Sequence, residues 1–243
     1  MERLTLQPLL NKLKRRNHLQ AEDESALLGL PYTVNKLEPS RYLVRQGDRA
    51  SFAYVLLSGF AYRQKVVGDG GRQIVALQVP GDAVDIQNSL LKFADHSVQA
   101  LSAIMVARIP RQALLDLAAV RPAIAKALWR DTLVDGSIAW EWMTNIGRRS
   151  ALMRLAHLLC EIAIRLEAVT FQNGEMSKVP MTQEHMSDAL GLTTVHVNRM
   201  VKELEKTGLI ARNGRSVSVL DMQKLREFAD FQDYYLHLDQ LID

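Results

Sequence analysis

Side chains that could contact DNA recur along the segment 194–207 of this 243-residue chain. They combine amide, guanidinium and ammonium donors with one small apolar group, and they are Val195, Asn198, Arg199, Lys202 and Lys206. Groups of these kinds read base edges in a DNA major groove and hold phosphate oxygens. Val197, Val201 and Leu204 follow the i, i+4, i+7 spacing of a buried helix face. The segment therefore predicts a helix that packs on one side and presents DNA-binding groups on the other.

A tight turn and a second helix precede this segment. Thr182 is a good N-cap, because its hydroxyl can accept a hydrogen bond from a free amide of the first helical turn. Gly191 ends the helix that Thr182 opens, since glycine enters the left-handed region without steric cost, and Thr193 can cap the next helix. The sequence therefore predicts a helix-turn-helix whose second helix carries the DNA-binding side chains.

A short β-hairpin is predicted next. Asn213-Gly214 is a strong two-residue hairpin turn, and Val217 and Val219 alternate on the return strand. From position 193 to position 215 the chain carries five basic and two acidic residues, a local net charge of +3. The hairpin is therefore predicted to be a basic wing beside the helix-turn-helix.

Composition limits the class of protein. The whole chain has a net charge of +3 and 48% hydrophobic residues, so the argument for a nucleic-acid partner depends on local charge. Cys160 is the single cysteine, which excludes an internal disulfide and a four-cysteine metal or iron–sulfur site. Basic residues at 12–16 argue against a signal peptide, and no uncharged apolar stretch is long enough to span a bilayer. We therefore expect a cytoplasmic protein, with those basic residues on a solvated helix face.

The region from Val34 to Pro110 is typical of short strands. Glycine-bearing turns separate five β-type runs, at 41–45, 52–57, 60–67, 72–79 and 97–109. Short strands at regular spacing indicate an antiparallel barrel or jelly roll. Such a barrel can hold one small ligand in its interior.

A long helix is predicted to follow the barrel, from Pro122 to about Asn145. Its apolar stripe consists of Ile124, Leu128, Val134, Ile138, Trp142 and Met143. A helix this apolar either packs within its own domain or pairs with a copy of itself. Because Asp131, Asp135 and Glu141 disfavour complete burial, pairing in a dimer is the interpretation that we favour.

Two further helices are predicted after Gly147, at which the long helix is expected to end. One covers 148–166 and places Cys160 on its buried side, which favours a structural thiol over a redox sensor. The other is a C-terminal helix from Met222 to Ile242. Together with the barrel, these helices indicate an α+β fold.

Four groups of residues carry a resemblance to a known family. They are Gly47-Asp48 with Tyr54-Val55-Leu56-Leu57-Ser58-Gly59, Pro80-Gly81-Asp82, Gly147-Arg148-Arg149-Ser150-Ala151 with Arg154-Leu155-Ala156, and Thr182-Gln183-Glu184 with Gly191-Leu192-Thr193 and Val197-Asn198-Arg199. With a barrel, a long helix and a winged helix-turn-helix in series, the chain resembles the catabolite-activator and fumarate–nitrate-reduction regulator (Crp/Fnr) family. The resemblance covers nearly the whole chain.

The resemblance implies a fold and a function. The α+β fold would comprise an effector-sensing, cyclic-nucleotide-binding-like β jelly-roll barrel at 1–120, a dimerisation helix at 121–146 and a winged helix-turn-helix domain at 147–243. The function would be transcription regulation rather than catalysis, by a homodimer that binds an inverted-repeat site. Double-stranded DNA, a second copy of the chain and RNA polymerase would be its partners.

Ten residues are the predicted DNA contacts: Thr182, Gln183, Thr193, Thr194, Val195, His196, Asn198, Arg199, Lys202 and Arg215. By the resemblance, the base contacts fall on Thr194, Val195, Asn198 and Arg199, with Arg199 at the place of an arginine that reads guanine. Val195 replaces the glutamate common in the family. A valine can touch a thymine methyl but cannot accept from a cytosine amine, so the preferred half-site is expected to differ.

The other contacts are expected mainly at the DNA backbone. Gln183, Lys202 and Arg215 are predicted phosphate contacts, which set register rather than sequence. His196 lies between the two faces of its helix, so it is either a further phosphate contact or an ordinary surface histidine.

The candidate effector-pocket residues are Gly81, Asp82, Asp95, His96 and Ser97. Family members that bind cyclic nucleotides hold the phosphate with an arginine next to a serine or threonine. By the resemblance, that pair falls on Ala94-Asp95 or, with a shifted alignment, on His96-Ser97, and neither pair offers a guanidinium fork. We therefore expect no cAMP binding of the usual kind and leave an unknown small-molecule effector open.

Other cofactors and functions have weaker support. Haem-bound members use axial ligands that include histidine, but His96 alone does not lead us to expect haem. No cofactor and no metal site are predicted, and a cupin-type enzyme would need clustered histidines that the barrel region lacks. Two alternatives stay open: a constitutive regulator without an effector, and a ligand-sensing barrel that acts through protein partners.

Overall fold

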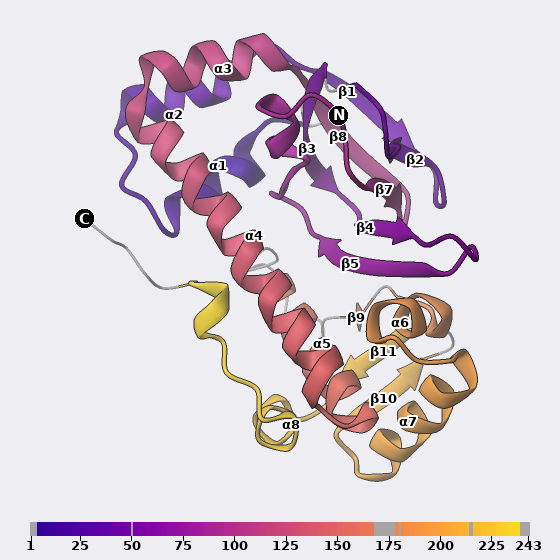
Figure 1. The fold of residues 1–243 in the computed structure, drawn as a ribbon. Coiled ribbons are helices and arrows are strands. Elements are labelled where there is room, and N and C mark those ends of the chain that lie inside the picture. The colour runs from indigo at the N-terminus through magenta and orange to yellow at the C-terminus, as the bar shows by residue number, and fades with distance from the viewer. Residues whose placement is uncertain (1–3, 50, 168–177, 180, 214–215, 239–243) are drawn as a thin grey trace. The chain divides into compact units, whose positions relative to one another are not determined.

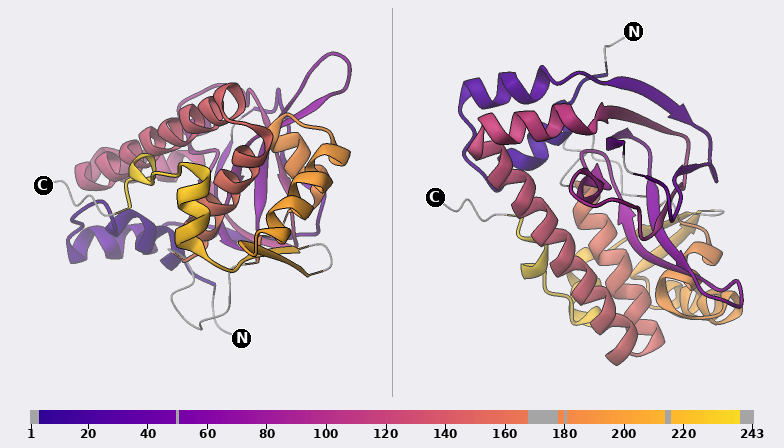
Figure 2. Two further views of the ribbon diagram at one scale, coloured as in Figure 1. Left: turned by 90° about the horizontal axis from the view of Figure 1, so that it is seen from below. Right: turned by 45° about the horizontal axis from the view of Figure 1, so that its top comes forward.

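Two compact units make up the chain in the computed structural model, which describes residues 4–49, 51–167, 178–179, 181–213 and 216–238. The first unit comprises Met1–Gln64, Leu77–Ser137 and Leu236–Asp243, and the second comprises Lys65–Ala76 and Ile138–Tyr235. Figure 1 labels the elements, and Figure 2 gives two further views of them. Across the described ranges, no helix has both the length and the apolar character needed to cross a membrane.

Two four-stranded sheets form the barrel (Figure 1). One contains, in spatial order, β1 (Thr33–Leu37), β8 (Ile104–Pro110), β3 (Phe52–Ser58) and β6 (Ala83–Val84). The other contains β2 (Tyr42–Val44), β7 (Ser97–Ala100), β4 (Ala61–Val66) and β5 (Arg72–Gln78). The jelly-roll-like barrel is therefore confirmed, with two differences: the run predicted at 97–109 is two strands, β7 and β8, and the strands β1 and β6 were not predicted.

Two apolar cores lie on opposite faces of β3. The barrel interior contains Val44, Leu56, Ala61, Val84, Ala94, Val98, Ala100, Ile104 and Val106, contributed by both sheets. Val55 and Leu57 belong instead to a second core, because successive side chains of a strand point to opposite faces. The helices that complete this second core are α1 (Gln7–Lys14), α2 (Ala21–Leu28), α3 (Arg111–Val120) and the beginning of α4.

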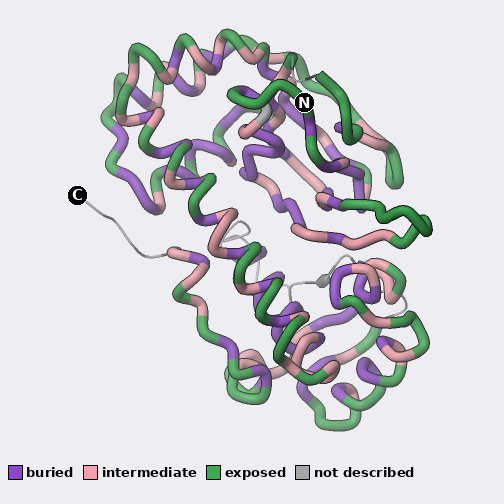
Figure 3. Tube along the Cα trace, in the orientation of Figure 1, coloured by how far each residue is buried: buried purple, intermediate pink, exposed green. Residues whose placement is uncertain are grey.

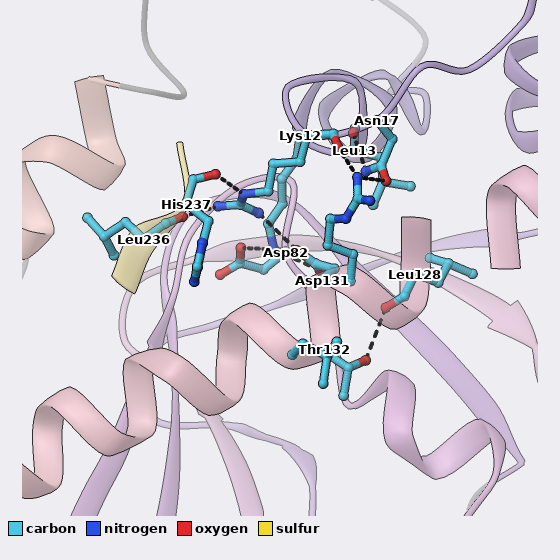
Figure 4. A network of polar contacts seen from close by, with 12 residues as sticks. Lys12, Leu13, Asn17, Asp82, Leu128, Asp131, Thr132, Leu236 and His237 are labelled. Carbon is cyan, nitrogen blue, oxygen red and sulfur yellow. Dashed lines mark hydrogen bonds and ion pairs between the residues drawn. The ribbon is translucent and has the colours of Figure 1, made fainter. Parts of the chain in front are cut away.

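A buried group of charges joins α1 to α4 within the first unit (Figure 4). The Nζ atom of Lys12 lies 2.8 Å from Asp82 Oδ1 and 2.8 Å from Asp131 Oδ1. Arg16 Nη1 lies 3.4 Å from the same Asp131 oxygen, and its Nε and Nη2 donate to backbone carbonyls of residues 236–237 at 2.7 Å. Burial alone would lower the pKa of Lys12, but the charges of Asp131 and Asp82 raise it above its ordinary value. The prediction of a solvated helix face is therefore wrong for Lys12 and Arg16.

The long helix α4 extends from Pro122 to Arg148. It passes through Gly147, at which the sequence predicted a break, and the next helix begins at Ala151. A glycine inside a helix costs only about 1 kcal/mol relative to alanine, so it does not by itself end the helix.

The two faces of α4 are not those that the sequence pattern indicated. Most of the predicted pairing stripe is buried within the chain, namely Ile124, Leu128, Val134, Ile138 and Trp142. Asp131 is buried beside them because Lys12 and Arg16 compensate its charge, so its acidity does not mark an exposed face. A different apolar face lies open along the helix (Figure 3): Trp129, Leu133, Trp140 and Met143 are 69%, 58%, 69% and 70% exposed.

The second unit is organised around α5 (Ala151–Glu167), which contacts each of the other helices of this unit that follow it. These are α6 (Gln183–Leu190), α7 (Thr194–Lys206) and α8 (Met222–Ala229). A three-stranded sheet of β10 (Ile210–Asn213), β11 (Ser216–Val219) and β9 (Lys178–Val179) completes the unit. Asn213 pairs with Ser216, which confirms the predicted hairpin, although residues 214–215 lie outside the described ranges.

The C-terminal helix is shorter than the predicted span 222–242. It ends after Ala229 because Asp230 takes the left-handed conformation, with φ of 49°. The N–H of Phe231 then donates to the carbonyl oxygen of Arg226 at 2.9 Å, which closes the last turn. A short 3₁₀ turn follows at Tyr234–Leu236, and positions 239–242 of the predicted helix lie outside the described residues.

Candidate nucleic-acid interface

Local hydrogen bonds fix the ends of both helices of the helix-turn-helix. Thr182 Oγ1 accepts from the N–H of His185 at 3.2 Å, and His185 Nδ1 accepts from the N–H of Thr182 at 3.4 Å. Gly191 follows α6 with φ of 63°, and Thr193 Oγ1 accepts from the N–H of His196 at 3.2 Å. The three predicted helix signals are confirmed. The reciprocal cap by His185 was missed, because glutamate or glutamine is the residue expected at that position.

The helix α7 has one buried and one exposed face (Figure 3). Its buried side chains are Val197, Met200, Val201 and Leu204, which include all three predicted from the spacing. Val195 is 82% exposed, and Thr194, Arg199 and Lys202 are exposed on the same helix. An apolar side chain and two cationic side chains thus face solvent together, as base-edge and phosphate contacts would require.

Gln183 and Asn198 lie together rather than apart. Asn198 Nδ2 donates to Gln183 Oε1 at 2.8 Å, and both side chains are partly buried. The sequence assigned Gln183 to a phosphate and Asn198 to a base, and it gave no sign that the two amides touch. A direct bond between side chains 15 residues apart in the chain cannot be inferred from helical spacing.

The remaining predicted DNA contacts differ in what their side chains touch and in how far they are buried. The hydroxyls of Thr182 and Thr193 cap their helices, and Thr194 Oγ1 lies 3.4 Å from Ser187 Oγ. His196 is partly buried. Arg215, the predicted contact from the wing, lies outside the described residues.

Gly81 and Asp82, from the candidate effector pocket, lie against α1. Gly81 has φ of 93°, and a Cβ there would lie 2.7 Å from the backbone oxygen of Pro8. Asp82 Oδ2 accepts from the N–H of Val79 at 2.8 Å, while its Oδ1 pairs with Lys12. These contacts give both residues a structural role in the turn before β6.

The other three candidate effector residues meet at the start of β7. His96 is 2% exposed, and its Nδ1 lies 2.6 Å from Asp95 Oδ1. Its Nε2 lies 3.0 Å from Asp85 Oδ1, a carboxylate that sequence reasoning missed. Ser97 Oγ accepts from the N–H of Gln46 at 3.0 Å. Two carboxylates therefore flank one imidazole, a charge pattern that disfavours an incoming phosphate.

Arg63 on β4 is a second charged residue that the sequence pattern did not reveal. It pairs in register with Val98 and follows Ala61 by two positions, so it lies on the interior face of the barrel. Its Nε and Nη2 atoms are buried and have no hydrogen-bond partner among the described residues.

Burial raises the pKa of Asp135 to about 6, against the opposing charges of Lys12 and Arg63. Among the residues described, no three His, Cys, Asp or Glu side chains are grouped to hold a metal ion.

Cys160 is a buried thiol with no exposed surface. Burial raises its pKa to about 12, so it is protonated at neutral pH, and the thiolate is the reactive form. We expect a thiol reagent that releases a coloured leaving group to react at least about 100-fold more slowly with the native protein than with the protein in urea. Rapid reaction of the native protein would contradict this prediction and favour a redox sensor.

A barrel of the cyclic-nucleotide-binding type, a long helix and a winged helix-turn-helix together define a DNA-binding transcription regulator. Two family profiles match the chain: "Crp-like helix-turn-helix domain" over residues 153–228 and "Cyclic nucleotide-binding domain" over residues 34–121. The chain is 32% identical over 191 residues to the transcriptional activator protein FnrL of Cereibacter sphaeroides, covering 77% of this chain and 76% of that protein. The chain therefore belongs to the Crp/Fnr family of transcription regulators.

Two further comparisons agree. The nitrogen fixation regulation protein FixK of Azorhizobium caulinodans is 31% identical, with 73% of this chain and 71% of that protein covered. The solved structure of FixK2 from Bradyrhizobium japonicum matches with a TM-score of 0.74 at 26% identity, covering 82% of this chain and 97% of that chain. Membership of this family implies DNA binding, and the family consists of regulators rather than enzymes.

Proposed function

We propose that the protein acts as a homodimer that binds an inverted-repeat DNA site through α7 and does not respond to cAMP in the usual way. The observation that carries the DNA-binding part is the exposed set Val195, Arg199 and Lys202 on a helix whose opposite face is buried. In the major groove, Arg199 would donate to guanine O6 and N7, and Val195 would touch a thymine methyl. RNA polymerase is the partner expected for a regulator of this family.

Replacing Arg199 with alanine tests this assignment. In a homodimer the substitution removes one bidentate guanine contact from each half-site, worth about 1 to 3 kcal/mol each, so specific affinity should fall on the order of 30-fold or more while non-specific affinity changes little. Fluorescence anisotropy with an operator and a scrambled duplex measures both. Lys202→Ala is the matched control, because loss of a phosphate contact weakens both duplexes alike and reduces the salt slope by about one for each half-site. Equal operator affinity of Arg199→Ala and the unmodified protein would refute the assignment.

The exposed face of α4 supports the homodimer. Trp129, Leu133, Trp140 and Met143 are exposed, and Gly136 and Gly147 complete a series whose steps alternate between four and three residues. This is the heptad spacing of a coiled-coil seam. Among the described residues, no side chain lies within 4 Å of where a Cβ would stand at either glycine, so a partner helix can approach closely. Such pairing would present two copies of α7 to successive major grooves, roughly 34 Å apart.

The surroundings of His96 support the proposal on cAMP. The flanking carboxylates of Asp85 and Asp95 oppose a phosphate, and His96 offers an imidazole instead of a guanidinium fork. Two forms of regulation remain compatible with this site: a different effector, and constitutive binding controlled by the amount of protein. Arg63, with two buried donor nitrogens, favours an effector that carries a hydrogen-bond acceptor to the interior of the barrel.

Thermal unfolding tests the response to cAMP. A ligand that binds the folded state at 100 times its Kd stabilises it by about 2.7 kcal/mol, which raises Tm by several degrees. We expect no change in Tm with millimolar cAMP. A clear rise would contradict the proposal, and native mass spectrometry compared with the denatured mass would reveal any other retained effector.

A further inference from the structure

The hydrogen bond between Gln183 and Asn198 restricts what Asn198 can present to DNA. An asparagine amide has one acceptor, Oδ1, and two N–H donors on Nδ2. One donor is directed to Gln183 Oε1 at 2.8 Å. The acceptor and the second donor then remain side by side on the free edge of the amide. Within the described part of the chain, no further hydrogen bond involves the Asn198 side chain.

That free edge matches one base in the major groove. Adenine presents N7 as an acceptor and N6 as a donor, whereas guanine presents two acceptors, N7 and O6. An amide edge with one donor and one acceptor can satisfy adenine at both atoms. If the amide were reversed, so that Oδ1 accepted from Gln183, the edge would carry donors and would suit guanine. The direction of the Gln183–Asn198 bond therefore decides between the two purines.

The backbone of the DNA would hold Gln183 in the required direction. Phosphate oxygens accept hydrogen bonds and do not donate them, so a glutamine beside a phosphate turns its Nε2 toward the phosphate. Its Oε1 then faces Asn198, as in the structure. The earlier expectation of a phosphate contact and the observed bond thus require the same orientation of Gln183.

The helix-turn-helix keeps the two amides together. Gln183 is the first residue of α6, directly after the cap residue Thr182. Asn198 follows the exposed Val195 by three positions and precedes Lys202 by four, so all three lie on one side of α7. The Thr193 cap sets where α7 begins and hence where Asn198 lies along it.

We propose that Gln183 is a positioning residue that orients Asn198 to read an adenine in each half-site. Asn198 Oδ1 accepts from adenine N6 and Asn198 Nδ2 donates to adenine N7, while Gln183 Nε2 contacts a phosphate. The proposal rests on DNA reading by α7, as proposed above. It makes Gln183 a determinant of sequence specificity although it touches no base.

Selection of operators from a duplex library with randomised half-sites, using the full-length protein and its variants, tests the proposal. The unmodified protein should select adenine at one position of each half-site, and Asn198→Ala should lose that preference. Gln183→Met keeps the length of the side chain but cannot accept from Asn198. It should lower the preference for adenine over guanine at that same position by about tenfold or more.

Gln183→Glu separates positioning from phosphate binding. A glutamate still accepts from Asn198 Nδ2 but repels a phosphate, so overall affinity should fall while the preference for adenine remains. Lys202→Ala is the control for a plain phosphate contact, and it should weaken all duplexes alike. A circular dichroism spectrum equal to that of the unmodified protein checks that each variant is folded.

The outcomes distinguish this inference from the proposed function. If Gln183→Met weakens every duplex equally and leaves the preference for adenine unchanged, Gln183 is an ordinary phosphate contact and the inference is overturned. If it changes neither affinity nor preference, the inference is overturned as well. If Arg199→Ala retains full operator specificity, or the unmodified protein selects no sequence, the proposed function itself fails.

Discussion

Replacing Trp140 with aspartate is expected to make the protein monomeric and to lower its affinity for a complete operator on the order of 100-fold or more. Trp140 is 69% exposed in the single chain, so its removal costs little internal packing. In a paired seam, the same position would be buried against a second helix, where an unpaired carboxylate is strongly unfavourable. The loss of affinity follows because a dimer holds both half-sites at once and a monomer holds one.

Sedimentation velocity and operator binding measure the two effects separately. Val120→Asp is the matched control, since Val120 is an apolar residue of α3 that is 72% exposed and lies outside the α4 seam. This control should remain dimeric and keep its affinity for the operator. A Trp140→Asp variant that still sediments as a dimer would place the subunit interface elsewhere.

Replacing Lys12 with methionine is expected to destabilise the protein by about 3 to 5 kcal/mol, the range for loss of one partner from a buried ion pair. Lys12 contacts both Asp82 and Asp131 at 2.8 Å. In its absence, Arg16 would be left 3.4 Å from Asp131, and Asp82 would lose the contact with the Lys12 ammonium group. Urea unfolding measures the change in free energy.

Lys14→Met provides the comparison for that experiment. The Lys14 side chain is 46% exposed and pairs with Glu24 at the surface, so its loss should cost less than about 1 kcal/mol. Equal losses of stability from the two substitutions would contradict the account in which the buried ion pairs of Lys12 stabilise the folded protein. Partial recovery in a Lys12→Met/Asp131→Asn double variant would support it.

The stability of the Lys12→Met variant is expected to depend on pH, because Lys12 affects the pKa of Asp135. Burial raises the pKa of Asp135 to about 6, and an acid whose pKa rises on folding stabilises the folded state while it is protonated. The unmodified protein therefore loses stability through this group as the pH rises from about 4 to about 6. Lys12 opposes the shift, so its removal should raise the pKa of Asp135 further, and the stability deficit of the variant should grow as the pH rises through about 6. A deficit that is the same at pH 4 and pH 7 would contradict this account.

The helix-turn-helix was predictable because its signals are local. Thr182, Gly191 and Thr193 each act on residues within one helical turn, so their types and spacing suffice to place both helices. The short strands of the barrel were predictable for a similar reason, since glycine-bearing turns separate them in the sequence. Local chemistry thus accounts for most of the elements and for the exposed side of α7.

Features that depend on distant residues were not predictable. By its residue type Asp131 indicates a solvent-exposed position, but Lys12, 119 positions away in the sequence, neutralises its charge. The choice of buried face on α4 depends on that pairing. The positive φ of Asp85 has no reliable sequence signal for a residue other than glycine. Asp230, which shortens the C-terminal helix, likewise has a positive φ that its residue type does not reliably predict.

The three tryptophans of the chain, all in α4, provide an optical signal for subunit association. Trp129 and Trp140 are exposed, whereas Trp142 is buried and donates from Nε1 to the carboxylate of Glu161 at 2.9 Å. Pairing along the exposed seam would remove the first two indole rings from water, so their fluorescence would shift to shorter wavelength while Trp142 contributes a constant background. Dilution of the unlabelled protein would therefore give the dimer dissociation constant directly from its emission spectrum.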